Sequence, residues 1–190
     1  MRLGILGGTF DPPHTGHLLA ATDAYERLAL DRLAFVPAKA QPLKIGVVRT
    51  EPAHRLAMLE RLVAGDDRFS VDPVEMDRPG LSYTVDTLAD FAGRYPEARR
   101  FFLIGEDFVT QFPQWREPEQ IATLAEVVVL ARLTPDAAPA RPAYPMSFVA
   151  TRRVDVSSTE VRERVRAGKP IRGFVPEAVA DYIRSAGLYR

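Results

Sequence analysis

The stretch Gly7-Gly8-Thr9-Phe10-Asp11-Pro12-Pro13-His14-Thr15-Gly16-His17 joins a short apolar run, Leu3 to Leu6, to a helical pattern that begins near Leu18. Glycines let the backbone approach a ligand closely. A helix start presents unpaired N–H groups and the positive end of a dipole. His14 and His17 are three residues apart, so they share a face in a first helical turn. This order of strand, loop and helix predicts a site for a polyphosphate.

The chain has 190 residues, a length typical of one domain, which we place at 1–190 with a small helical segment at 155–190. Its 25 basic and 25 acidic residues balance, so no overall field attracts nucleic acid or a membrane, and neither is an expected partner. The absence of cysteine excludes disulfides, thiolate metal sites and cysteine nucleophiles. The first residues form no basic region followed by a long apolar stretch, so we expect a cytoplasmic protein.

Short apolar runs alternate along the chain with helical patterns. Two of the runs, Phe101–Ile104 and Val127–Leu130, are continuously apolar, which is typical of strands buried on both faces of a parallel sheet. The predicted strands are Arg2–Leu6, Leu33–Pro37, Phe69–Val71, Arg100–Ile104, Val127–Ala131 and Ser147–Val149. The predicted helices are His17–Ala29, Pro52–Val63, Thr84–Arg94 and Pro118–Leu124. This alternation predicts an α/β fold, a doubly wound Rossmann-like parallel sheet with helices on both faces. Ligands in such folds bind at the carboxyl ends of the strands.

The end of the chain predicts two further helices. Ser157 or Ser158 is a natural N-cap for a helix over Glu160–Ala167, and Gly168 is a natural C-cap. A second helix is predicted from about Pro176 to Ser185. Two segments lack helical periodicity and are predicted loops, namely Ala38–Glu51 and Leu133–Pro145.

The stretch Gly7–His17, called the Gly–His loop below, lacks both the dinucleotide fingerprint and the P-loop sequence. It resembles the HxGH signature of the nucleotidyltransferase superfamily. A second signature of that superfamily is matched by Val156-Ser157-Ser158-Thr159-Glu160-Val161-Arg162, near the other end of the chain. Two motifs in the right order are far more specific than either motif alone.

Other segments narrow the resemblance to the bacterial nicotinate-nucleotide adenylyltransferases. These segments are Ser82–Leu88, Phe102–Asp107 with Trp115, His54–Leu59, Phe174–Pro176, Tyr182–Ile183 and Gly187–Tyr189. One departure is Leu43, which precedes Lys44 where the family often has a histidine. The resemblance implies transfer of an adenylyl group from ATP to nicotinate mononucleotide, with deamido-NAD and pyrophosphate as products.

The implied nucleophile is a phosphate monoester, whose second pKa is near 6, so it is largely dianionic at neutral pH and requires no general base. Direct in-line attack without a covalent intermediate is therefore expected. The enzyme must hold two anions in line and stabilise the charge of the leaving pyrophosphate. Magnesium is expected only on the ATP phosphates, with few protein ligands, because no side-chain cluster in the sequence has metal-binding spacing.

The resemblance also assigns roles to residues. His14, His17 and Arg162 are the expected catalytic residues, because they supply donors and positive charge to the phosphates. The expected ATP-binding residues are Gly7, Gly8, Thr9, Phe10, His14, Gly16, His17, Gly105, Asp107, Ser157, Ser158, Thr159 and Arg162. The expected binding residues for nicotinate mononucleotide are Lys44, Tyr83, Thr84, Trp115 and Arg132. Asp11 and the pair His54-Arg55 are interpreted as structural.

Structural interpretations stand beside these roles. Ser158 and Arg162 also fit an ordinary helix cap with a solvated arginine, and Trp115 also fits a partly buried core residue. Rival functions are an adenylyltransferase for phosphopantetheine or nicotinamide mononucleotide, and a regulatory protein that keeps the fold without catalysis. A homo-oligomer is compatible with the sequence, which carries no pattern that sets the oligomeric state.

Overall fold

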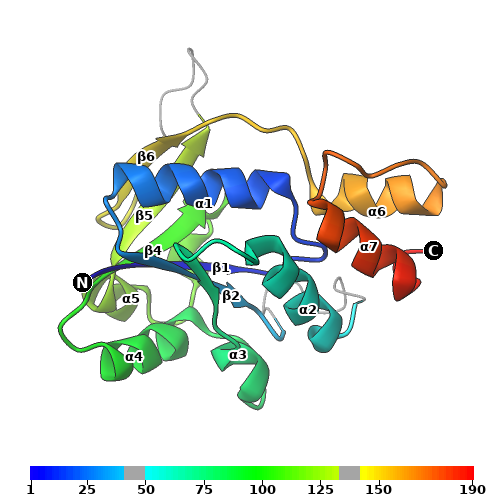
Figure 1. The fold of residues 1–190 in the computed structure, drawn as a ribbon. Helices are drawn as coiled ribbons and strands as arrows, with labels where there is room; N and C mark the ends of the chain where they lie inside the picture. The colour runs from blue at the N-terminus through cyan, green and yellow to red at the C-terminus, as the bar shows by residue number, and fades with distance from the viewer. Residues whose placement is uncertain (41–49, 133–141) are drawn as a thin grey trace.

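A computed structural model of the chain describes residues 1–40, 50–132 and 142–190, apart from the side chain of Arg132. Its centre is a six-stranded sheet in the order β3-β2-β1-β4-β5-β6 (Figure 1). All five strand pairs are parallel. The strands are β1 (Arg2–Gly8), β2 (Arg32–Pro37), β3 (Phe69–Val71), β4 (Arg99–Gly105), β5 (Glu126–Arg132) and β6 (Ser147–Thr151). The strand order reverses between β1 and β4, and a doubly wound sheet binds its ligands at such a point.

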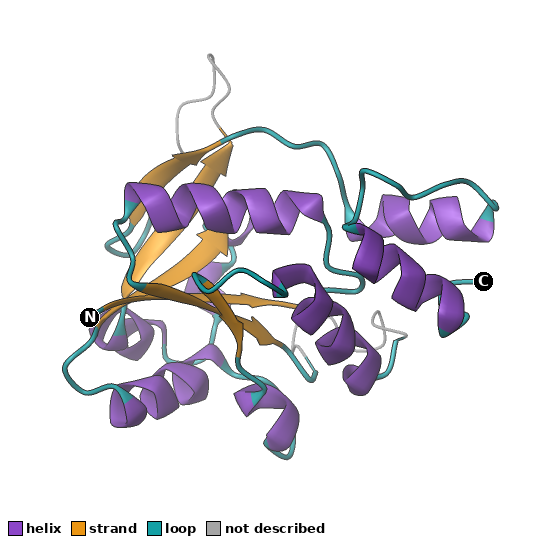
Figure 2. Cartoon of the chain, in the orientation of Figure 1, coloured by secondary structure: helices purple, strands orange, loops and turns teal. Residues whose placement is uncertain are grey.

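Helices cover both faces of this sheet, as predicted (Figure 2). The longer helices are α1 (Thr15–Arg27), α2 (Pro52–Val63), α4 (Thr84–Arg94), α5 (Pro118–Leu124), α6 (Ser158–Arg166) and α7 (Glu177–Ser185). The shorter ones are α3 (Val74–Asp77) and the 3-10 turns η2 (Glu106–Phe108) and η3 (Phe112–Gln114). In Figure 1, α1 lies across one face, and α3, α4 and α5 lie beneath the other.

Side chains of the central strands alternate between two hydrophobic cores. Phe101 and Leu103 of β4 belong to the core beneath α1, α2 and α7. Phe102 and Ile104 belong to the core that α4 and α5 cover. Because successive residues of a strand point to opposite faces, a strand between two helical layers must be apolar at every position. The continuous apolar run in this strand is thereby explained.

The predicted elements agree with the structure to within two or three residues at their ends. Helix α3 was not predicted, since four residues are too short to show a helical period. The predicted loops lie largely outside the described residues, and so do Leu43 and Lys44.

The C-terminal segment folds against the end of the sheet where β1 finishes, and the C-terminus lies on that side (Figure 1). Ser157 caps α6, because its side chain accepts a hydrogen bond from the amide of Glu160. Gly168 and Gly187 follow the two last helices with φ values of +64°, the left-handed conformation that ends many helices. The amide of Thr15 donates to the carbonyl of Phe174 at 2.9 Å, so the segment contacts the start of α1.

Asp23 of α1 holds Arg152, the first residue after β6. One carboxylate oxygen lies 2.6 Å from the Arg152 guanidinium, and the other accepts the Arg152 amide at 2.7 Å. Burial raises the pKa of Asp23, but the hydrogen bonds and charge of Arg152 outweigh it and hold the pKa below its usual value. The ionised form is therefore the one that stabilises the fold.

Replacing Asp23→Asn should lower the free energy of unfolding by about 1–3 kcal/mol at neutral pH, because an amide nitrogen would face the Arg152 donors. The difference from the parent should shrink as the pH falls below about 4, where the Asp23 carboxylate takes up a proton. Urea denaturation at several pH values measures both effects. Asp181→Asn breaks an exposed pair with Arg184 and serves as the control, with an expected change below about 0.5 kcal/mol. A difference that is constant down to acidic pH would contradict the assignment.

Candidate functional site

The Gly–His loop begins where β1 ends, and two features of its backbone fix its path. Phe10 has a φ of +52°, a conformation uncommon for a residue with a side chain. Its ring folds back over Gly8, where an added Cβ would lie 2.7 Å from the Phe10 ring. Gly8 therefore has to be glycine for Phe10 to enter the core, where it is 3 % exposed. The chain then turns into α1.

His14 and His17 stand together at the start of α1. Their ring centroids are 3.7 Å apart. The amide of His14 donates to Nδ1 of His17 at 3.2 Å. Because Nδ1 is occupied as an acceptor, the neutral His17 ring carries its hydrogen on Nε2. The backbone thus holds His17 in a tautomer that donates from Nε2.

Gly16 allows His14 to lie close to the backbone of the first turn. A Cβ on Gly16 would lie 3.0 Å from Nδ1 and 3.1 Å from Cε1 of His14. Such distances are shorter than ordinary packing contacts, so an alanine would displace the imidazole. The glycine of the motif is explained by this contact.

The start of α6 meets the Gly–His loop directly. The hydroxyl of Ser158 donates to the carbonyl of Pro12 at 2.8 Å. One terminal nitrogen of Arg162 donates to the carbonyl of Asp11 at 2.7 Å, and the other donates to the hydroxyl of Thr159 at 3.0 Å. The two sequence motifs, at opposite ends of the chain, are therefore one structural unit.

Asp11 lies inside this unit and is 5 % exposed. Its carboxylate accepts a hydrogen bond of 2.6 Å from the hydroxyl of Tyr189, the penultimate residue. Burial and this hydrogen bond raise the pKa of Tyr189, so the phenol stays protonated and donates. Asp11 is thus more than the turn former suggested by its neighbours Pro12 and Pro13, since it attaches the chain terminus to the loop.

Arg55 of α2 is a second buried charge that the sequence did not single out as part of the site. Its side chain is among the fully buried ones, with 1 % exposed. It donates to the carbonyls of Thr9 at 2.8 Å and of Ala38 and Lys39 at 2.6 and 3.1 Å. A fourth, longer bond of 3.3 Å reaches the carbonyl of Thr50. Burial lowers the pKa of Arg55, and the Asp11 carboxylate opposes that shift.

A small cavity of about 80 Å³ lies beside the Gly–His loop at the carboxyl ends of β1 and β4. Gly7, Gly105, Thr84 and Trp115 are among the residues that line it. Trp115 packs against Phe112 with ring centroids 5.3 Å apart. Its buried Nε1 has no hydrogen-bond partner among the described residues. The cavity therefore has an aromatic side chain in its wall beside the loop.

Three further predicted site residues are described, two of them with their side chains. Tyr83 precedes α4, and the guanidinium of Arg116 lies 4.8 Å from the centre of its ring. Asp107 is exposed on η2, directly after β4. Arg132 is the last residue of β5, and its side chain is not described. Lys44 lies outside the described residues.

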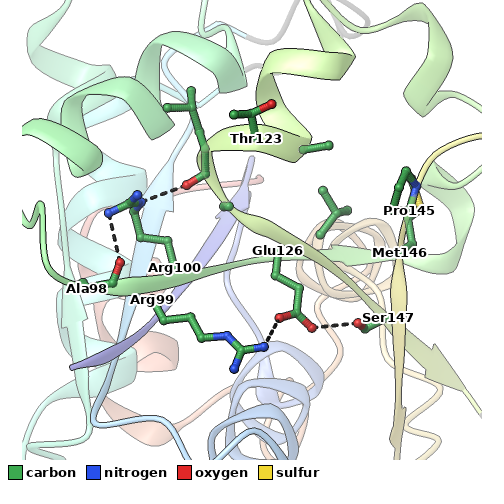
Figure 3. Close-up of a pocket in the computed structure, with 12 residues that line it drawn as sticks. Ala98, Arg99, Arg100, Thr123, Glu126, Pro145, Met146 and Ser147 are labelled. Atoms are coloured by element: carbon green, nitrogen blue, oxygen red, sulfur yellow. Dashed lines mark hydrogen bonds and ion pairs between the residues drawn. The ribbon is translucent and has the colours of Figure 1, made fainter.

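A larger hollow of about 590 Å³ lies at the opposite end of the sheet, where β4 and β5 begin. Figure 3 shows Glu126 between Arg99 and Ser147. Both contacts are 2.7 Å long. Arg100 donates to backbone carbonyls, including that of Leu124 at 2.8 Å. The charged groups of this hollow are already paired, and it is far from the strand ends that carry the two motifs.

Among residues 1–40, 50–132 and 142–190, no group of three or more His, Asp or Glu side chains could hold a metal ion. Within the same ranges, none of the helices has both the length and the apolar character to cross a membrane.

The chain is similar to known proteins along its whole length. Residues 5–164 match the family described as cytidylyltransferase-like. A protein of Gemmatimonas aurantiaca named "Probable nicotinate-nucleotide adenylyltransferase" is 48% identical over 200 residues, which cover 100% of this chain and 93% of that protein. A protein of the same name from Thermus thermophilus is 42% identical, with 100% of both chains covered.

Solved structures share the fold. The nicotinic acid mononucleotide adenylyltransferase of Plasmodium falciparum, complexed with APC, superposes with a TM-score of 0.80 at 17% identity. The match covers 99% of this chain and 96% of that one. The same Plasmodium enzyme complexed with NaAD gives a TM-score of 0.79 at 18% identity, with 99% and 97% covered.

Replacing Arg55→Met should lower the free energy of unfolding by more than about 3 kcal/mol. The buried carbonyls of Thr9 and Ala38 would lose their donor, and the buried Asp11 would lose its neighbouring cation. Arg55→Lys keeps the charge but not the fork of donors, so its loss should be smaller. Arg61→Met, at an exposed position of the same helix, is the control and should cost less than about 1 kcal/mol. Guanidinium denaturation followed by circular dichroism gives all three values. Equal losses at positions 55 and 61 would refute the role of Arg55.

Proposed function

We propose that this chain, which belongs to the nicotinate-nucleotide adenylyltransferase family, binds the triphosphate of ATP between the Gly–His loop and the start of α6. The family reaction transfers the adenylyl group of ATP to nicotinate mononucleotide and yields deamido-NAD, a step of NAD biosynthesis. The observation that carries the proposed site is the direct contact of the two motifs, through Ser158 with Pro12 and Arg162 with Asp11. Two weakly specific motifs that meet in space support one anion site.

His17 and Arg162 are proposed as the groups that stabilise charge on the phosphates. His17 donates from Nε2, because its Nδ1 accepts the amide of His14. Arg162 keeps a permanent charge and has five N–H donors, of which its contacts with Asp11 and Thr159 use a part. Donors that are already oriented cost no reorganisation when charge moves onto the leaving pyrophosphate. The attacking phosphate is itself dianionic, so no residue has to remove a proton.

The pyridine ring of the nucleotide is proposed to lie in the small cavity against Trp115. This position places it at the carboxyl ends of β1 and β4, next to the proposed phosphate site. The flat indole face suits an aromatic ring, and a buried Nε1 without a described partner offers a hydrogen bond. Thr84 lines the same cavity, and Tyr83 adjoins it in the chain. Lys44 and Arg132 are proposed to contact the phosphate or the carboxylate of the substrates.

Magnesium is proposed to reach the site on the ATP phosphates. Mg²⁺ keeps several waters and commonly uses substrate phosphates with one or two carboxylates. Asp11, the carboxylate within the Gly–His loop, is already engaged by Tyr189. The metal would neutralise phosphate charge, and His14, His17 and Arg162 would orient the oxygens that it leaves exposed.

Several expectations from the sequence stay predictions. They are a single domain over 1–190 with its helical segment at 155–190, a cytoplasmic location, a compatible homo-oligomer, and the lack of nucleic-acid and membrane partners.

Purified protein with ATP and Mg²⁺ should release pyrophosphate when nicotinate mononucleotide is added, with deamido-NAD as the second product. Phosphopantetheine should give no pyrophosphate, because a cavity closed by an aromatic wall suits a flat ring better than a flexible chain. A coupled pyrophosphate assay with chromatography of the products measures both reactions. Turnover of phosphopantetheine without turnover of nicotinate mononucleotide would sink the proposal.

Replacing His17→Ala should lower kcat by about 10²–10³, which is typical for the loss of one oriented donor in an active site. His17→Gln should retain more activity than the alanine variant, since a glutamine amide can reach the place of Nε2. The control is His54→Ala, because His54 contacts the Tyr182 hydroxyl on α7 at 2.8 Å, outside the proposed site. Steady-state kinetics and thermal melts separate activity from stability. Unchanged turnover in a folded His17→Ala protein would remove His17 from the mechanism.

A further inference from the structure

Glu75 is a buried carboxyl group that the proposed mechanism does not use. It lies on the short helix α3 and is 8 % exposed. Its side chain lines the same small cavity as Trp115 and Thr84. A carboxyl group in a cavity proposed for a negatively charged ring substituent requires an explanation.

Two hydroxyl groups hold this carboxyl in place. Thr87 of α4 donates to Oε1 of Glu75 at 2.7 Å. Ser82 also hydrogen-bonds the Glu75 side chain, and its oxygen accepts the amide of Lys39 at 3.0 Å. The carboxyl is therefore fixed at the wall of the cavity, and it cannot turn out to solvent without breaking both contacts.

Glu75 has no direct ionic partner among the described residues, although several charged groups lie near it. The Arg78 guanidinium is the cation that acts on it, and one nitrogen of that group lies 4.0 Å from Asp86. The ammonium of Lys39 donates to the carbonyl of Arg78. Of the nearby acids, Asp72 pairs with Arg94, and Asp77 is exposed. Burial raises the pKa of Glu75 above its usual value, while the two hydroxyls and Arg78 oppose the shift.

An ionised Glu75 would repel the carboxylate of nicotinate, whereas a protonated Glu75 would not. The neutral carboxamide of nicotinamide mononucleotide would feel little of this charge. The two nucleotides share the pyridinium ring, the ribose and the phosphate, so a comparison between them isolates the ring substituent. In a partly buried site, one unit charge at a few ångströms changes binding by roughly tenfold or more.

We propose that Glu75 is a specificity-determining residue: in its protonated form it does not repel a pyridine carboxylate and can donate a hydrogen bond to it, whereas the ionised form would repel the carboxylate and leave the carboxamide largely unaffected. This inference rests on the proposed position of the pyridine ring beside Trp115. Thr87 and Ser82 act as positioning residues, because they hold the carboxyl at the cavity wall and set how readily it ionises.

The test is the ratio of kcat/KM for nicotinate mononucleotide to kcat/KM for nicotinamide mononucleotide, measured from about pH 5 to about pH 9 at saturating ATP. Titrations of the shared phosphate and of the catalytic residues cancel in this ratio. The ratio should fall by roughly tenfold or more as the pH rises through the raised pKa of Glu75, because the proton is lost there. Titration of the intrinsic fluorescence of Trp115, the sole tryptophan, gives the corresponding ratio of binding affinities for the two nucleotides.

Three variants sharpen the test. Glu75→Gln cannot ionise, so its ratio should stay high and independent of pH. Thr87→Val removes a hydroxyl that favours the ionised form, so the fall in the ratio should move to higher pH. Asp77→Asn removes an exposed carboxylate two residues away on the same helix and should leave the profile of the parent unchanged.

A ratio that does not vary with pH in the parent protein would overturn the proposal, and so would a fall of equal size in Glu75→Gln. If Glu75→Gln does not fold, the parent profile and its displacement in Thr87→Val decide the question. Failure to use either nucleotide would refute the proposed function itself. Turnover of nicotinate mononucleotide with a flat ratio would refute only the role of Glu75.

Discussion

The geometry of the proposed active site depends on the contacts between the C-terminal segment and the Gly–His loop, among them the hydrogen bond from Tyr189 to Asp11, which joins residues 178 apart in the sequence. The Gly–His loop has little secondary structure of its own between β1 and α1. Its carbonyls at Asp11 and Pro12 are satisfied by Arg162 and Ser158. Buried main-chain groups need such partners, because leaving one unpaired costs about as much as a lost hydrogen bond. The C-terminal segment is therefore what keeps the loop in a shape suited to phosphate.

Two opposite charges are buried here, Asp11 within the loop and Arg55 of α2 beside it, and the Asp11 carboxylate favours the charged form of Arg55. Asp11 is 5 % exposed and Arg55 is 1 % exposed. A lone buried charge is costly, whereas a pair with further hydrogen bonds can break even. Arg55 donates its hydrogen bonds to main-chain carbonyls, and the Asp11 carboxylate accepts its hydrogen bond from the Tyr189 hydroxyl. Removing only one of the two charges is therefore costly, because the other stays buried without it, even though the two together add little stability over apolar residues of the same size.

Sequence periodicity predicted the fold well because strands between two helical layers are apolar throughout. The helix Pro52–Val63 and the strand Phe69–Val71 agree with the structure to the residue. The same reasoning did not predict that Arg55 and Glu75 are buried, because charged residues in helical segments normally face solvent. Their partners are main-chain carbonyls and hydroxyls, which carry no signal at a fixed spacing. The tautomer of His17 was equally hidden, since it depends on one backbone amide.

The two buried groups that the sequence did not reveal support opposite sides of the same segment. Arg55 donates to the carbonyl of Lys39, and the amide of Lys39 donates to the Ser82 hydroxyl that holds Glu75. Arg55 also bonds Thr9 of the Gly–His loop. Hydrogen bonds therefore run without interruption from the proposed phosphate site to the proposed pyridine cavity. One short backbone segment, Ala38–Lys39, thus connects the two proposed subsites. An enzyme that holds two nucleotides in a fixed relation lowers the entropic cost of bringing their phosphates into line.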